Sequence, residues 1–285
     1  MMRKFIANAY IWILLILLYS PLAFIAIFSF TESKVLGNWT GFSTKLYQNL
    51  FTGGMQGGSS LLSAVENTVI IAVIAAVLAT ILGTVAAIGM FNLRGRLRKG
   101  MQFLNNIPML NPDVITGVSL FLLFVFLGVT QGYVTVILAH VSFCTPYVVL
   151  SVMPKLTQMN PNIYEAALDL GATPFQALRK VLLPILRPGM VSGFILAFTM
   201  SLDDFAVTFF TRGTIGLDTL STYIYTDARK GGLTPELRPL MTIIFLFILF
   251  LLVIINVRQA RLQKKFDKNE KIRRYSDGSA FSQRL

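Results

Sequence analysis

Apolar runs, separated by short polar segments, account for most of this chain. About six of them are long enough to cross the roughly 30 Å hydrocarbon core of a bilayer as helices. They are residues 10–30, 69–91, a stretch that ends near Gly128, and residues 133–154, 190–210 and 239–257. The pattern predicts an all-α, polytopic membrane protein whose transmembrane domain occupies residues 1–257.

The composition supports a lipid-embedded chain. Of the 285 residues, 54% are hydrophobic and only 13% are charged, and the mean hydropathy is +0.67, which excludes an ordinary soluble domain. The first apolar run follows Arg3 and Lys4, has roughly 20 uncharged residues and shows no small-residue cleavage site, so it is too long for a signal-peptide core. We expect it to remain as the first span, with membrane lipid around it.

The positions of the basic residues predict which side of the membrane each segment occupies. The net charge is +12, and many Lys and Arg residues gather in the turn at residues 92–100 and in the tail at residues 258–285. Because these charges lie between and after the apolar runs, we expect no nucleic-acid partner, and the positive-inside rule makes both segments cytoplasmic. With an even number of spans, both termini are cytoplasmic. Residues 31–67 and 211–238 are then on the outer side.

The sequence lacks the motifs that covalent chemistry would need. It contains no phosphate-binding G-x-x-x-x-G-K-[ST] run, no dinucleotide fingerprint and no hydrolytic triad, so it predicts no enzyme activity. Cys144 is the only cysteine, which excludes an intrachain disulfide and a cysteine-cluster metal site, and we expect no metal site. His140 is the only histidine and lies in an apolar run, where it is either a hydrogen-bonded packing residue, which we favour, or a proton relay.

The polar segment at residues 155–188 carries local signals for two short helices. Gly171 supplies a left-handed stop for the first helix. Thr173 and Gln176 form a T-x-x-Q capping box for the second, and Pro184 is expected to limit it. By itself, this pattern fits an interfacial hairpin that covers the inner mouth of a helix bundle.

The same segment also resembles a known motif. Glu165, Ala166, Ala167 and Gly171, followed by an apolar-Pro pair, resemble the E-A-A-x-x-x-G loop of permeases of type I ABC importers. In that family, this cytoplasmic loop is the coupling helix, which inserts into a groove of the ATPase subunit. Small alanines permit close helix approach there, and a glycine lets the chain reverse.

The resemblance extends over most of the chain, and within the superfamily it points to the C-type permeases of spermidine/putrescine importers. The segments that carry it are residues 39–50, 111–115, 144–149 and 198–210. It implies a sister permease subunit, two ATPase subunits and an extracytoplasmic polyamine-binding protein as partners, in a bacterial cytoplasmic membrane. No cofactor is expected on this chain, because ATP and Mg²⁺ would bind to the partner ATPase subunits.

Acidic residues in the apolar runs favour a cationic substrate. Asp203 and Asp204 interrupt the fifth run, Asp113 follows Pro112 in the third, and no Lys or Arg lies within a span to pair with them. A polyamine in the translocation pathway would supply that positive charge. Alternatively, Asp113 favours a helix N-terminus through the helix dipole. One of the adjacent pair, about 100° from the other on a continuous helix, would then accept hydrogen bonds from hydroxyl groups.

On the outer side, Trp39 and Tyr223 are candidates for cation–π contact with the substrate, although aromatic residues at a membrane interface are more often anchors. The sequence thus predicts one half of a polyamine translocation pathway. One alternative keeps the importer class but carries a metal complex, thiamine or an organic anion. Another is an autonomous secondary transporter, for which we identify no broken-helix ion site. A third is a membrane scaffold, against which the intramembrane carboxylates argue.

Overall fold

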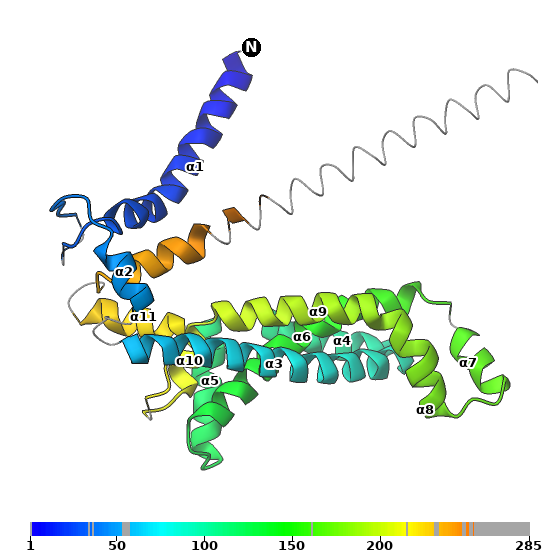
Figure 1. Cartoon of the computed structure of the whole chain (residues 1–285). Coiled ribbons are helices and arrows are strands. Elements are labelled where there is room, and N and C mark those ends of the chain that lie inside the picture. The colour runs from blue at the N-terminus through cyan, green and yellow to red at the C-terminus, as the bar shows by residue number, and fades with distance from the viewer. Residues whose placement is uncertain are drawn as a thin grey trace, which may run out of the picture. The chain divides into compact units, whose positions relative to one another are not determined.

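The computed structural model is built from helices (Figure 1). It describes residues 2–33, 35, 37–52, 58–160, 162–214, 216–230, 234–246, 249–250 and 253. Every regular element of the described residues is helical, which confirms the all-α prediction. The chain divides into a central unit, residues 57–229, and a terminal unit, residues 1–56 with 230–285. The basic tail predicted at residues 258–285 lies outside the described residues.

The terminal unit contains α1 (Met2–Phe28), α2 (Lys45–Thr52) and the apolar helix Leu237–Leu246. Within α1, the apolar window of the candidate span Asn8–Phe28 is only 6% buried, as expected of a helix that contacts lipid. The Arg238 side chain is fully buried, and its Nη1 donates a hydrogen bond of 2.8 Å to the Ser33 carbonyl. This bond joins the two segments of the unit across 205 residues of sequence.

Three helices pack side by side in the central unit: α3 (Gly58–Asn92), α6 (Tyr133–Gln158) and α9 (Leu183–Asp203) (Figure 1). Small residues occupy the closest approaches. A Cβ atom added at Gly83 of α3 would lie 2.7 Å from the Val148 side chain of α6, and one added at Gly193 of α9 would lie 3.1 Å from the same side chain. The helices therefore approach more closely than larger side chains would allow.

Four helices of the described part are long and apolar enough to span a membrane: Asn8–Phe28, Ser60–Asn92, Tyr133–Gln158 and Pro174–Asp203. The pair α4 (Gly95–Leu110) and α5 (Asp113–Phe126) passes the same test only when the two helices are taken together, and they are bent by 104° at the break between them. The third predicted span is therefore not one straight helix. Asn111 and Pro112 are extended there, in keeping with the bias of residues before proline against the helical region. The predicted sixth span, residues 239–257, continues past the described residues.

The fifth predicted span, residues 190–210, is also broken. α9 ends at Asp203, Asp204 has φ −64° and ψ 132°, and α10 (Ala206–Thr211) begins two residues later. The expectation that Asp203 and Asp204 lie on one continuous helix was wrong, because Asp204 leaves the helix and its carboxylate binds the N–H groups of α10. α11 (Leu220–Arg229) follows in the same unit.

The polar loop forms the expected helical hairpin, with one difference. α7 (Asn162–Asp169) ends at the Gly171 turn, and Thr173 and Gln176 make the predicted capping box at α8 (Pro174–Ala177). The second helix does not stop at Pro184. It continues through the π-helix η1 (Leu178–Leu182) into α9, since the i→i+5 spacing accommodates a residue without an N–H. The hairpin and α9 thus form one helical path. α7 and α8 lie at one end of the bundle, and α5, α10 and α11 lie toward the other (Figure 1).

Candidate functional site

The three predicted carboxylates of the substrate path line one cleft in the central unit. Asp113, Asp203 and Asp204 surround a volume of about 460 Å³ together with apolar side chains that include Val114 and Met200. The cleft lies where the α4/α5 break meets the α9/α10 break, so both interrupted spans contribute their chain ends to it. None of its described lining residues is basic, which leaves the carboxylates without a positive neighbour in the cleft.

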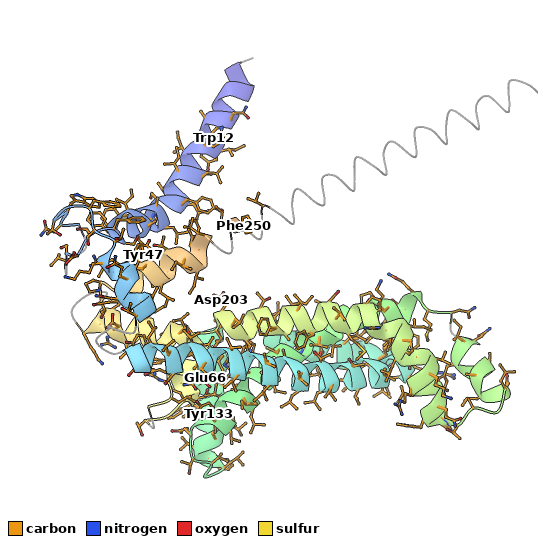
Figure 2. All side chains as sticks on the ribbon, in the orientation of Figure 1. Trp12, Tyr47, Glu66, Tyr133, Asp203 and Phe250 are labelled. Carbon is orange, nitrogen blue, oxygen red and sulfur yellow. The ribbon has the colours of Figure 1, made fainter. Side chains whose placement is uncertain are left out.

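Two adjacent aspartates have different environments. Asp203 is exposed at the end of α9 (Figure 2). The Asp204 side chain is 5% exposed and accepts hydrogen bonds from the Val207 N–H at 3.2 Å, the Thr208 N–H at 2.8 Å and the Thr208 hydroxyl at 2.8 Å. Asp204 therefore caps α10, a role that the sequence did not predict, and its bond from the Thr208 hydroxyl is of the kind expected for one of the pair. Of the two, Asp203 is the carboxylate that a ligand in the cleft can reach.

Asp113 has a position that is compatible with both of its predicted roles. It is exposed, occupies the first residue of α5 and lines the cleft. A carboxylate there is stabilised by the partial positive charge of the helix N-terminus, which agrees with the helix-dipole reading. The same position directs its charge toward the volume that Asp203 also borders.

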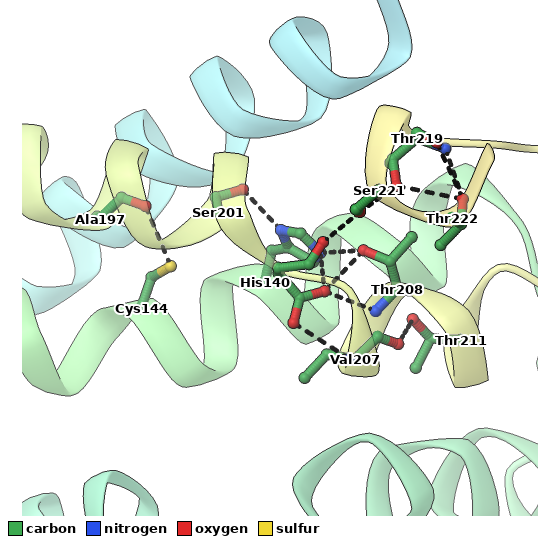
Figure 3. A network of polar contacts seen from close by, with 11 residues as sticks. His140, Cys144, Ala197, Ser201, Val207, Thr208, Thr211, Thr219, Ser221 and Thr222 are labelled. Atoms are coloured by element: carbon green, nitrogen blue, oxygen red, sulfur yellow. Dashed lines mark hydrogen bonds and ion pairs between the residues drawn. The ribbon is translucent and has the colours of Figure 1, made fainter. Parts of the chain in front are cut away.

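Behind Asp204 lies a polar network that centres on His140 of α6 (Figure 3). The His140 side chain is 1% exposed. Its Nδ1 is 2.6 Å from Ser201 Oγ, and its Nε2 is 2.9 Å from Thr208 Oγ1 and 3.4 Å from Asp204 Oδ2. The imidazole therefore connects α9 and α10 on the two sides of the break, as a hydrogen-bonded packing residue would.

The aromatic candidates do not line the cleft. Trp39 belongs to the terminal unit, is 48% exposed and contacts the Phe28 ring edge-on at 6.0 Å between centroids. Tyr223 lies in the first turn of α11, two residues before Tyr225, whose ring packs against the Phe205 ring at 4.7 Å. Neither candidate is among the residues that border the carboxylates, so their proposed cation–π role remains a prediction.

The hairpin has the geometry that its sequence signals predicted. Gly171 has φ +87°, its N–H bonds to the Leu168 carbonyl, and the Ala172 N–H bonds to the Ala167 carbonyl, which is the Schellman arrangement. Glu165 and Ala166 are exposed on α7, and Ala167 is partly buried. Leu170, at the turn, is 89% exposed, so the tip of the hairpin has an exposed apolar surface.

A hollow of about 860 Å³ lies beside the hairpin. Glu165 and Tyr164 of α7 border it, together with Arg94 and Arg98 from the basic turn that follows α3. Arg98 also lies over the Phe91 ring, 5.0 Å from its centroid. The basic turn that the charge rule placed in the cytoplasm therefore lies beside the hairpin, at one end of the central unit.

Comparison with known proteins identifies the family. The family described as binding-protein-dependent transport system inner membrane component matches residues 79–268. This chain belongs to that family. The permease is 37% identical over 254 residues, covering 89% of this chain and 96% of the relative, to the spermidine/putrescine transport system permease protein PotC of Haemophilus influenzae. It is 38% identical over 235 residues, 80% of this chain and 81% of the relative, to the putrescine transport system permease protein PotI of Escherichia coli.

The fold agrees with this assignment. The permease superposes with a TM-score of 0.63 on a chain of a bacterial ABC transporter involved in the import of the acidic polysaccharide alginate, at 15% identity, over 90% of this chain and 95% of that chain. The predicted type I importer fold and the resemblance to polyamine permeases are thus confirmed. The chain is an inner membrane component of a transport system.

Sequence reasoning missed two features of the site. It identified no broken helix, although Pro112 and the Asp203–Asp204 pair each mark one. It also treated His140 apart from the carboxylates, because 64 residues separate His140 from Asp204 and only the packing of α6 against the break brings them together. The signal present was the set of hydroxyl and imidazole groups in otherwise apolar runs, which need partners inside a membrane.

Proposed function

We propose that this chain is the membrane-spanning permease subunit of an ATP-driven importer that carries polyamines such as spermidine and putrescine into the cytoplasm. The observation that supports the substrate class is the cleft, where Asp113, Asp203 and Asp204 border apolar side chains and no described lining residue is basic. A polyamine has the complementary pattern of ammonium groups separated by short aliphatic segments. The names of the relatives in Haemophilus influenzae and Escherichia coli point to the same cargo.

The carboxylates have an energetic role in this proposal. Removing water from an ammonium group in a low-dielectric passage costs several kcal/mol per charge unless a fixed anion replaces the lost hydration. Asp203 and Asp113 are exposed to the cleft and can supply that replacement. The site must also release its cargo, and exposed carboxylates around an open volume bind less tightly than an enclosed cage would.

The proposed energy source is ATP, bound with Mg²⁺ by two ATPase subunits that dock at the hairpin. The exposed Leu170 and Phe175 side chains give this end an apolar surface, and Gly171 keeps the turn tight. From Pro174 to Asp203 the chain follows one helical path, so a displacement of the hairpin is carried to the cleft. A sister permease and an extracytoplasmic polyamine-binding protein complete the proposed assembly, with both termini of this chain in the cytoplasm.

Uptake by the assembled complex tests this function. The complex, isolated with its partner chains and reconstituted in vesicles, should accumulate radiolabelled spermidine or putrescine only when ATP and the binding protein are both present. Thiamine, iron complexes and organic anions should neither accumulate nor compete. Accumulation of one of these solutes instead of the amines would show that the cargo is different. Accumulation without ATP would support the alternative of an autonomous secondary transporter.

A further inference from the structure

Uncompensated positive charge borders the hollow beside the hairpin. Arg94 and Arg98 line this volume of about 860 Å³, and among the described residues neither guanidinium has a hydrogen-bond or ion-pair partner. Glu165 borders the same hollow without pairing with either arginine. Two guanidinium groups thus face one carboxylate around the hollow. The excess charge is positive, which favours an anionic ligand.

The other walls of the hollow are largely apolar. Ile88 and Phe91 come from the end of α3, and Leu178 comes from η1. The Arg98 guanidinium lies over the Phe91 ring, so basic and apolar groups are in contact at the wall. The volume falls within the roughly 300–1,000 Å³ that is usual for small-molecule sites. An amphiphile would cover both kinds of wall, whereas a small inorganic anion would leave the apolar side chains in water.

The hollow lies where the chain changes from apolar to basic. α3 stays apolar up to Phe91, and Arg94 closely follows. On α4, Leu97, Met101 and Leu104 are exposed on one face at helical spacing. Basic groups at the end of an apolar helix lie at the level of the lipid headgroups, and an exposed apolar face next to them contacts acyl chains. Phospholipid is therefore the amphiphile that surrounds this position.

We propose that the hollow binds the headgroup of an anionic membrane phospholipid, with Arg94 and Arg98 as the residues that bind its phosphate. Arginine suits this role because its planar set of N–H donors matches the geometry of phosphate oxygens. Basic pockets between membrane helices bind anionic headgroups in the same way. Because Tyr164 of α7 and Phe91 of α3 both border the hollow, the bound lipid contacts the hairpin and the bundle at once. This site is separate from the carboxylate cleft and does not depend on the cargo.

The lipid that the purified complex retains tests the proposal. The complex of this chain with its partner subunits is washed in detergent that contains equal amounts of phosphatidylglycerol and phosphatidylcholine. The wild-type complex should retain the anionic lipid with about fivefold preference. Arg94→Gln with Arg98→Gln should lower that preference by about threefold or more, because glutamine keeps hydrogen-bonding groups and loses the charge.

The matched control is Arg96→Gln with Lys99→Gln. It removes the same charge from the same basic turn, but neither residue borders the hollow. Its preference should differ from that of the wild-type complex by less than about 1.5-fold. Lipid that binds to the partner subunits is common to all these complexes, so the comparison removes it.

A second arm distinguishes the lipid from a soluble anion of the same chemistry. Inorganic phosphate and glycerol 3-phosphate, added at millimolar concentration during the wash, should leave the retained phosphatidylglycerol in place. Displacement of the lipid by either compound would assign the hollow to a soluble phosphate ligand and overturn the proposal.

Three further outcomes would also overturn it. One is a wild-type complex without preference for phosphatidylglycerol, a measurement that needs no variant. Another is an equal loss in the two double variants, which would show that the turn attracts lipid only through its overall charge. The third is full retention after loss of both arginines. If that double variant does not assemble, Arg98→Gln compared with Lys99→Gln makes the same distinction. None of these outcomes changes the proposed function, which the uptake of amines tests separately.

Discussion

At the end of α9 two identical side chains enter different surroundings. Asp203 is the last helical residue and its side chain is exposed in the cleft, whereas Asp204 turns back to bind the first N–H groups of α10. An aspartate that accepts several hydrogen bonds is held by the fold, and its charge is partly offset by the helix N-terminus. The exposed neighbour keeps its charge available for a ligand.

This difference predicts separate phenotypes for the two aspartates. Asp203→Asn should lower polyamine import by at least about tenfold, equivalent to about 1.4 kcal/mol, with assembly unchanged, because it removes only an exposed charge. Asp204→Ala should lower the stability of the complex by about 1–2 kcal/mol through loss of the α10 cap. Uptake per assembled complex and thermal unfolding in detergent measure the two effects. Normal uptake by Asp203→Asn would contradict the role given to its carboxylate.

Helix packing in the central unit depends on particular glycines. A Cβ atom at Gly83 would lie 2.7 Å from Cβ and Cγ1 of Val148, whose β-branched side chain cannot move without the α6 backbone. Gly89, further along the same helix, has open space around its Cα hydrogens within 4 Å. Substitution of alanine at each of the two positions therefore distinguishes the effect of helix packing from the effect of helix propensity.

We expect Gly83→Ala to destabilise the permease by about 1–3 kcal/mol, the usual cost of overpacking. Gly89→Ala should be neutral or stabilise it by up to about 1 kcal/mol, because alanine is the better helix former. Thermal unfolding of the two purified variants in the same detergent compares them directly. Equal stability of Gly83→Ala and the parent would show that α3 and α6 are further apart than described.

The hairpin gives a second prediction at the scale of an element. Because Gly171 has φ +87° and nothing within 4 Å of an added Cβ, the demand at this position is conformational and not steric. Gly171→Asn, which tolerates the left-handed region, should retain coupled transport, and Gly171→Val should hydrolyse ATP with several-fold less amine imported per ATP. Simultaneous measurement of ATPase activity and uptake distinguishes them. If both variants imported the same amount of amine per ATP, the conformation of this turn would have no role in coupling.

Features set by neighbouring residues could be predicted from the sequence, whereas features set by long-range contacts could not. The length of the apolar runs, the capping box at Thr173 and the stop at Gly171 are encoded by neighbouring residues, and all three were predicted. The break at Asp204 was not, since apolar periodicity does not show where a buried carboxylate finds its donors. The α9 continuation past Pro184 was missed for a related reason: a π-turn offsets the cost of proline, and propensity rules do not anticipate it.

At the scale of the molecule, the described contacts of the central unit sort the polar segments into two groups. Arg94 and Glu165 border one hollow beside the hairpin. Far from that end, Tyr133 donates a hydrogen bond to Asn67, whose amide donates to the Asp218 carbonyl at 3.0 Å. The first group joins the basic turn assigned to the cytoplasm with the hairpin that resembles a cytoplasmic loop. The second joins residues of the segments 31–67 and 211–238, which were both assigned to the outer side. Segments predicted to lie on the same side of the membrane are therefore close together within this unit.

Cysteine accessibility tests which group faces outward. In a Cys144→Ala background, a membrane-impermeant maleimide applied to intact cells should label Thr214→Cys, which is exposed in the segment after α10, and should not label Arg96→Cys until the membrane is opened. The reason is the positive-inside rule, which keeps the basic turn at residues 92–100 in the cytoplasm. Ser276→Cys examines the tail outside the described residues in the same way and should behave like Arg96→Cys. The parent protein should remain unlabelled, since Cys144 is buried. Labelling of Arg96→Cys in intact cells, with protection of Thr214→Cys, would invert the topology and place the hairpin on the side where no ATPase could reach it.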